Sequence, residues 1–173
     1  MTQLSYQPAF DPFHAAYRLL RLREGVVRVA PIPTDQLRIL DYYLLLPFRI
    51  EGIRVQQEHR KYRSLAKSYV SVRPYGELPE DRVLYSRMYS IQTAALDTLA
   101  RNKLISPEKY EIGIVEATQA NLPKALAERI AEDNTHQADL IEFLQILGTQ
   151  YKLLGTNGLK DRSGLMEHLY DAA

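Results

Sequence analysis

The hydrophobic pattern is strongest from Thr34 to Ile50, and this stretch predicts the central helix of the fold. Leucine, isoleucine and tyrosine recur there at spacings of three and four residues, as on a wide apolar helix face. Only Arg38 and Asp41 interrupt the run as charges. Thr34 can accept the first free amides, and Pro47 ends the helix because it lacks a backbone donor. A helix this apolar must be covered by the segments on both sides of it.

An N-terminal helix is predicted before this centre. Asp11 and Pro12 mark its start, it runs to about Glu24, and Gly25 supplies a left-handed stop. Four apolar residues at helical spacing form its predicted inward face: Phe13, Ala16, Tyr17 and Leu20. Three basic residues line up on the other side, either as a solvated face or as candidate contacts for an acidic partner or phosphate: His14, Arg18 and Arg21.

Residues 54–73 form the most basic stretch of the chain, with Glu58 as their only acid. If the stretch is helical, as predicted near residues 55–70, three cations form a ridge at spacings of three and four. Such a ridge binds a phosphate backbone, pairs with an acidic protein surface, or is simply solvated. The sequence leaves these three uses open. The candidate contacts for DNA or an acidic partner are Arg54, Arg60, Lys61, Arg63 and Lys67.

Two short strands and a long helix are predicted in the middle of the chain. Residues 26–33 are rich in β-branched side chains and end in two prolines, which suits an edge strand. Residues 110–118 alternate around Gly113 and predict a second strand. Between them, a turn-rich connector at residues 74–81 leads into a helix at about 81–103 with a continuous apolar seam.

Two further helices, at about residues 121–133 and 137–154, are close enough in sequence to form an antiparallel hairpin. The second helix has coiled-coil-like spacing, so its seam either packs on the domain or awaits a partner helix. The tail beyond it holds a short amphipathic segment that either docks on a partner or frays. The candidate protein-interface residues of these two segments are Leu140, Leu144, Leu147, Tyr151, Leu165 and Leu169.

Composition limits the class of protein. At 173 residues, with 46% hydrophobic residues, the chain can form one domain, or one domain with a tail. Its net charge is +1, so any binding of nucleic acid must come from a local patch. It has no cysteine, no secretory signal at its start and no apolar stretch of the roughly 18 residues that span a bilayer. We expect a soluble cytoplasmic protein with no membrane contact.

The sequence shows no catalytic, cofactor-binding or metal-ligating pattern. Its four histidines have no zinc-ligand spacing, and it contains neither a glycine-rich phosphate loop nor a GxSxG elbow. A site assembled from distant positions would leave no such signature. We therefore expect a protein that is not an enzyme and needs no cofactor or metal.

The order of elements predicts a mainly α fold: a winged-helix-like domain with a small β element and a C-terminal helical hairpin. The domain, with its N-terminal helix, would occupy residues 1–120, the hairpin packed on it residues 121–155, and the tail residues 156–173. Residues 69–80 form a long, proline-rich connector, unlike the tight turn of a helix-turn-helix. Sequence-specific reading of DNA is therefore the weaker form of this hypothesis.

Three hydrophobic segments stand out in this order: FDPFHAAYRLLRL (10–22), LRILDYYLLLPFRI (37–50) and LARNKLI (99–105). Together they resemble the middle component of bacterial ABC-three-component systems, a group that includes Lamassu-type defence against phages and plasmids. The resemblance covers about residues 8–120. It implies a winged-helix-like adaptor without catalysis, encoded between an effector, often a nuclease, and an SMC- or Rad50-like ABC ATPase. Such an adaptor would link the ATPase to the effector and to double-stranded DNA.

Two functional hypotheses follow from these observations. The first is the adaptor subunit, which needs partners and uses the basic ridge to contact DNA held by the ATPase. The second is a stand-alone winged-helix transcriptional regulator that binds a palindromic site as a homodimer. The near-zero net charge and the long connector both argue against the second.

Overall fold

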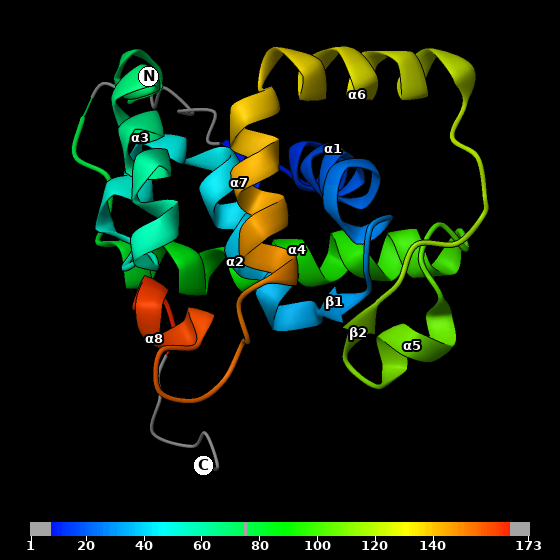
Figure 1. The fold of residues 1–173 in the computed structure, drawn as a ribbon. Helices are drawn as coiled ribbons and strands as arrows, with labels where there is room; N and C mark the ends of the chain where they lie inside the picture. Colours follow the sequence, from blue (N-terminus) through cyan, green and yellow to red (C-terminus); the bar gives the residue numbers. More distant parts are fainter. Residues whose placement is uncertain (1–7, 75, 167–173) are drawn as a thin grey trace, which may run out of the picture.

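The computed structural model describes residues 8–74 and 76–166, which form a mainly helical fold with a small two-stranded sheet (Figure 1). The helices are α1 (Pro12–Leu22), α2 (Thr34–Leu45), α3 (Leu65–Ser68), α4 (Asp81–Arg101), α5 (Pro107–Glu111), α6 (Lys124–His136), α7 (Ala138–Thr149) and α8 (Leu159–Ser163). The strands are β1 (Ile32–Pro33) and β2 (Ile114–Val115). The remaining turns are the 3₁₀ segments Pro8–Phe10, Pro47–Gly52, Gln57–Ser64 and Val70–Val72, and the π-helical segment Arg23–Val27.

The central position of α2 confirms the prediction from its apolar pattern. It packs against α1 on one side and α7 on another, and α4 runs across the lower part of the molecule in Figure 1. Nine of its twelve residues are buried, and Ile39, Leu40 and Tyr42 are fully so. The helix ends at Leu45, just before Pro47. One continuous core cluster around α2 includes residues from the predicted domain (1–120), from the predicted hairpin (121–155) and from the tail beyond it.

A buried ion pair joins three of these helices. Asp41 on α2 has no solvent exposure, and Arg18 on α1 donates to both of its oxygens, at 2.7 and 3.1 Å. Gln92 on α4 donates to the same carboxylate at 2.9 Å. Arg18 also donates to the Pro8 carbonyl oxygen at 3.1 Å. The rotation of α1 is therefore set by a polar contact inside the core.

The first helix does not stop at Gly25 as predicted. The chain continues through a π-helical turn over Arg23–Val27, without the left-handed conformation expected of the glycine. A Cβ at Gly25 would lie 2.8 Å from Cγ2 of Ile141 and 3.3 Å from the Asn134 side chain. The glycine is thus required for the close approach of this turn to α7, which the sequence alone did not reveal.

The sheet is shorter than predicted. β1 pairs antiparallel with β2, with Ile32 opposite Val115, and a single bridge joins Ile105 to Ala117. The expected strand over residues 110–118 is helical in its first part, because Ser106 caps α5 by accepting the amide of Lys109. The expected strand over residues 26–33 is likewise mostly π-helix and turn. In each case only a two-residue strand forms.

The predicted antiparallel hairpin of the last two long helices is wrong. A single residue, Gln137, joins α6 to α7, and α7 turns away instead of returning along α6 (Figure 1). The physical reason is where each helix finds its contacts. α7 is apolar on most sides and packs against α2, whereas α6 buries only Ile130 and is held to α1 by the Tyr17 hydroxyl, which donates to Asp133 at 2.6 Å.

The coiled-coil-like seam on α7 is part of the core. Gln36 on α2 ties it down by donating to the carbonyl oxygens of Leu147 and Tyr151 at 2.7 and 2.8 Å. Of the two predicted alternatives, packing on the domain is therefore confirmed. The assignment of the seam as a candidate protein interface is wrong, because the domain itself covers it. Leu165 is buried too, and Leu169 lies outside the described residues. The buried seam residues are Leu140, Leu144, Leu147 and Tyr151.

Substitution of Leu144 tests this assignment. Leu144→Ala should lower the free energy of unfolding of the isolated chain by about 2–5 kcal/mol, because it removes buried methyl groups and leaves a cavity. The measurement is urea unfolding followed by circular dichroism. Leu154→Ala, at a position that is 48% exposed, is the matched control and should change stability little. An equally small effect of Leu144→Ala would show that the seam is not part of the core.

Substitution of Asp41 tests the buried ion pair. Asp41→Asn leaves the Arg18 guanidinium buried without a counter-charge, which should cost about 3–5 kcal/mol of stability. The same unfolding assay measures it, with Glu132→Gln on the exposed side of α6 as the control. A loss below about 1 kcal/mol would show that Arg18 is compensated by other groups.

Candidate interaction surfaces

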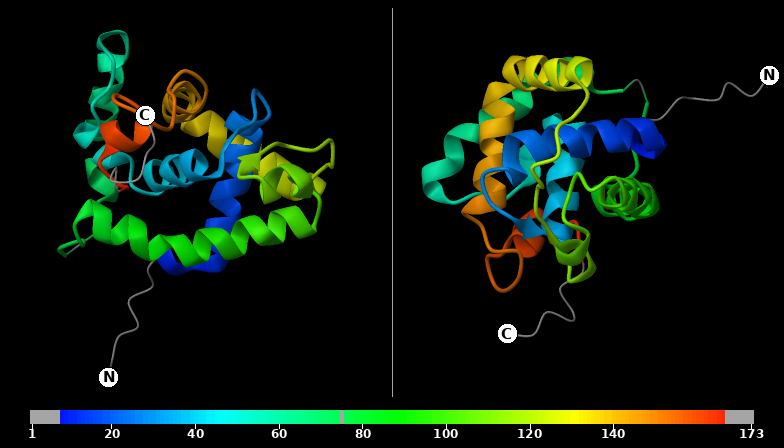
Figure 2. Two further views of the ribbon diagram at one scale, coloured as in Figure 1. Left: turned by 90° about the horizontal axis from the view of Figure 1, so that it is seen from below. Right: turned by 90° about the vertical axis from the view of Figure 1, so that its right-hand side faces the viewer.

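The cations Arg60, Arg63 and Lys67, called the basic ridge below, lie on the surface of the segment that includes α3. The predicted continuous helix is replaced by an eight-residue 3₁₀ segment, Gln57–Ser64, followed by the single turn of α3. A 3₁₀ helix has three residues per turn, so Arg60 and Arg63 point to the same side. All three ridge side chains are exposed. The segment stands at one corner of the molecule (Figures 1 and 2).

Aromatic contacts hold the inner side of this segment to the end of α7. The Tyr62 ring stacks on Phe143 with centroids 5.1 Å apart, and its hydroxyl donates to Glu142 at 2.8 Å. Burial and that hydrogen bond both raise the pKa of Tyr62. Nδ1 of His59 lies 2.8 Å from the Tyr151 hydroxyl. His59 is therefore a packed structural histidine, and these anchors keep the basic ridge facing outward.

Arg54 and Lys61, the other two candidate contacts of the basic stretch, also make contacts within the chain. Arg54 pairs with Asp161 on α8 at 2.9 Å, and its carbonyl oxygen accepts Nη1 of Arg162 at 2.6 Å. Arg54 thus fastens α8 to the body. Nζ of Lys61 lies 4.7 Å from the centroid of the Tyr62 ring, and this side chain remains exposed.

The basic face predicted on α1 is wrong for two of its three residues. Arg18 is only 5% exposed and forms the ion pair with Asp41. Arg21 is also buried and donates to the side chains of Asn134 and Gln137 at 2.9 and 2.8 Å. The helix is rotated from the predicted orientation, so the inward-assigned Phe13 is 84% exposed. His14 does lie on the surface.

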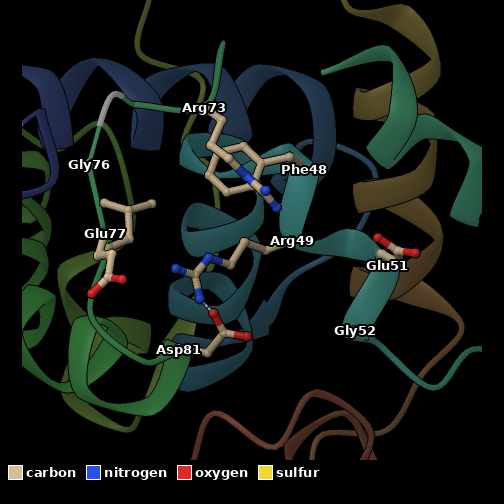
Figure 3. A pocket seen from close by; sticks show the side chains of 9 residues that line it. Phe48, Arg49, Glu51, Gly52, Arg73, Gly76, Glu77 and Asp81 are labelled. Atoms are coloured by element: carbon tan, nitrogen blue, oxygen red, sulfur yellow. Dashed lines mark ion pairs between the residues drawn. The ribbon is translucent and has the colours of Figure 1, made fainter. Parts of the chain in front are cut away.

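A hollow of about 670 Å³ lies between the Pro47–Gly52 segment and the start of α4 (Figure 3). Arg49 points into it but is neutralised by an ion pair with Asp81, and Nη2 donates to the Pro79 carbonyl oxygen at 3.1 Å. The Arg73 guanidinium lies 5.2 Å from the centroid of the Phe48 ring. The lining holds acids as well as arginines, without a nucleophile paired to a base. This hollow gives no basis for a reaction.

Neither a cluster of metal-ligating side chains nor a membrane-spanning helix is found among the described residues. No group of three or more His, Cys, Asp or Glu among residues 8–74 and 76–166 is arranged to hold a metal ion. Over the same residues, none of the helices has both the length and the apolar character needed to cross a bilayer.

A further surface was missed by reasoning from the sequence. On the outer side of α4, Tyr89 is 55% exposed, and its ring covers the guanidinium of Arg38 from α2. The apolar seam of α4 was predicted, but this tyrosine lies outside it. The only signal in the sequence was Arg38, a charged residue inside the apolar run of α2. To interpret it, one must know that Asp41 pairs with Arg18 and not with Arg38.

Comparison with known proteins identifies the family. The family model described as "ABC-three component (ABC-3C) system Middle Component 5" matches residues 4–171, nearly the whole chain. Neither the curated proteins nor the solved structures contain a significant match. The chain therefore belongs to the Middle Component 5 family of ABC-three component systems.

Proposed function

We propose that this middle component is a non-catalytic adaptor in a Lamassu-type complex that defends bacteria against phages and plasmids. It links an SMC- or Rad50-like ABC ATPase to an effector nuclease in the cytoplasm, and its basic ridge contacts double-stranded DNA held by the ATPase. Family membership supports the partnership with other components of the system. We propose in addition that these components are an ATPase and a nuclease, and that the chain contacts DNA.

The basic ridge is the observation that carries the DNA contact. Arg60, Arg63 and Lys67 are exposed on one projecting segment, and Glu58 is the single acid in the sequence of residues 54–73. Clustered cations of one sign bind the phosphate backbone by releasing its counterions, without reading base sequence. An adaptor that follows DNA already held by an ATPase requires this kind of contact.

The order of elements supports a winged-helix-like arrangement. α1, β1, α2 and α4 are followed by the bridge at Ile105, by α5 and by β2, which pairs back to β1. In this interpretation, the loop containing α5 takes the place of the wing. Residues 46–80, which carry the basic ridge, form an insertion between the second and third helices of the plan. Fold alone does not choose between DNA reading and protein binding for such a domain.

Neutralisation of the ridge tests the DNA contact. The triple variant Arg60→Gln, Arg63→Gln, Lys67→Gln should assemble normally with the co-expressed ATPase and effector but retain DNA less well. If all three side chains contact phosphates, the slope of log affinity against log salt should become shallower by about 2.7. Fluorescence anisotropy of a labelled double-stranded DNA across a salt series measures this on the purified complex.

A charge-matched control separates the effect of the basic ridge from the effect of a lower net positive charge. The triple variant Lys124→Gln, Arg129→Gln, Lys152→Gln removes three exposed cations from other parts of the surface and should leave the slope unchanged. Collapse of assembly in the ridge variant would instead make the ridge a protein interface. A wild-type chain that ignores the co-expressed components and binds a palindromic DNA site as a dimer would favour the stand-alone regulator.

A further inference from the structure

Four arginines are buried among the described residues, and one of them has fewer hydrogen bonds than the others. Arg18, Arg21 and Arg23 each donate at least three hydrogen bonds. Arg38 is equally buried, at 4% exposure, but donates only one, from Nη2 to the Thr93 hydroxyl at 3.1 Å. Its Nε and Nη1 have no hydrogen-bond partner among the described residues. Unpaired donors on a buried charged group are costly, so Arg38 calls for a functional explanation.

Nearby groups compensate the Arg38 charge only in part. The carboxylate of Asp35 lies 3.9 Å from Nε and is 41% exposed, so solvent screens it. Burial and a hydrogen bond to Asp97 raise the pKa of Tyr110 to about 12, although the nearby Arg38 lowers it, and a neutral phenol supplies no counter-charge. Burial also raises the pKa of Tyr85, whose hydroxyl has no hydrogen-bond partner among the described residues. Asp41, one turn along α2, is already bound to Arg18.

The cover over Arg38 is an exposed side chain. The Tyr89 ring lies over the guanidinium, with Cζ 4.1 Å from the ring centroid, and the tyrosine itself is 55% exposed. Exposed side chains change rotamer in picoseconds to nanoseconds. An anionic group from outside can therefore reach the unpartnered nitrogens after a rotation of Tyr89, without unfolding of either helix.

Two hollows flank this point along α4. One, of about 820 Å³, is lined by Tyr85, Ser86 and Tyr89, and the other, of about 380 Å³, by Asp97 and Arg101. Residues spaced by four form a ridge that is inclined to the helix axis. Residues 85, 89, 93, 97 and 101 therefore form one inclined ridge on α4 that connects the two hollows, which we call the Tyr89 face. An elongated segment that follows this ridge would pass over Tyr89 and Arg38.

The charges around the Tyr89 face suit a protein segment better than a nucleic acid. A guanidinium binds a carboxylate or a phosphate with two hydrogen bonds. Here, however, charges of both signs lie around the face. Asp35 and Asp97 are negative, and Arg87 and Arg101 are positive. Acids at the rim repel a polyanion, whereas mixed charge beside an exposed tyrosine is typical of protein interfaces. The basic ridge differs in this respect, because its three side chains are all positively charged.

We propose that the Tyr89 face binds an elongated segment of another component of the ABC-3C system, and that an Asp or Glu carboxylate of that segment pairs with Arg38. The inference rests on the proposed function, in which this chain links other components. It adds the surface and the chemistry of the contact. The pairing would satisfy the two nitrogens that have no hydrogen-bond partner among residues 8–74 and 76–166.

The variant Arg38→Met tests the proposal with two measurements. Replacing an under-paired buried charge by an apolar side chain of similar length should leave the melting temperature of the isolated chain unchanged or raise it. The same variant should reduce capture of the co-expressed components on the tagged chain at least tenfold. A purely structural arginine would give the opposite result, with a lower melting temperature and capture in proportion to the folded chain. Arg129→Met, on exposed α6, is the matched control and should alter neither value.

Site-specific crosslinking tests the surface independently of Arg38. A benzophenone amino acid in place of Ser86, which is exposed and lines the larger hollow, should crosslink to another protein component of the assembled complex. The same group in place of Arg129 should not. Crosslinks to DNA, or none from position 86 in a complex that forms, would overturn the proposal.

These outcomes separate the inference from the proposed function. Normal capture by the Arg38→Met variant would overturn the inference alone, because the adaptor would still assemble through another surface. A wild-type chain that captures no component would overturn both. Loss of DNA retention in the ridge variant bears only on the proposed DNA contact.

Discussion

The carboxylate of Asp41 determines how the three main helices fit together. It is fully buried on α2, accepts two hydrogen bonds from Arg18 on α1 and a third from Gln92 on α4. A buried charge is tolerated only where such partners are in place, so each helix must present one specific residue at this point. α1 is therefore rotated to bring Arg18 inward, and Phe13 is left outside. The exposed faces of the domain follow from this internal requirement.

The elements that could be predicted from the sequence are those whose signals are local and long. α2 and α4 have many turns of regular apolar spacing, and a proline fixes the end of α2. The rotation of α1 could not be predicted, because a periodicity analysis places arginines on the surface and has no means of pairing Arg18 with a residue 23 positions away. The lengths of the two strands could not be predicted for a related reason. Two-residue strands depend on their partner across the sheet, and α5 forms because of a local cap at Ser106.

Some residues of the candidate surfaces could likewise be predicted from the sequence, and others could not. Spacings of three and four placed Arg60, Arg63 and Lys67 on one side of a helix. The three side chains are exposed although the segment is mostly 3₁₀, because three-residue spacing keeps side chains aligned in either helix. Arg54 shared the same composition but is used to hold α8. Arg38 could not be singled out from the sequence. It lies three residues before Asp41, so the two would ordinarily be assigned to each other, and only the structure shows that Arg18 takes the carboxylate.

The two proposed surfaces differ in how they depend on the core. The basic ridge lies on an insertion between α2 and α4 and is anchored to α7 by Tyr62. Its charges can therefore change without altering the packing of the main helices. The Tyr89 face lies on α4 above Arg38 of α2, and two nitrogens of this arginine have no hydrogen-bond partner among the described residues because Asp41 is committed to Arg18. A contact through this face would be coupled to helix packing, as suits a permanent subunit interface. A solvated ridge of one sign suits a reversible, salt-dependent contact with DNA.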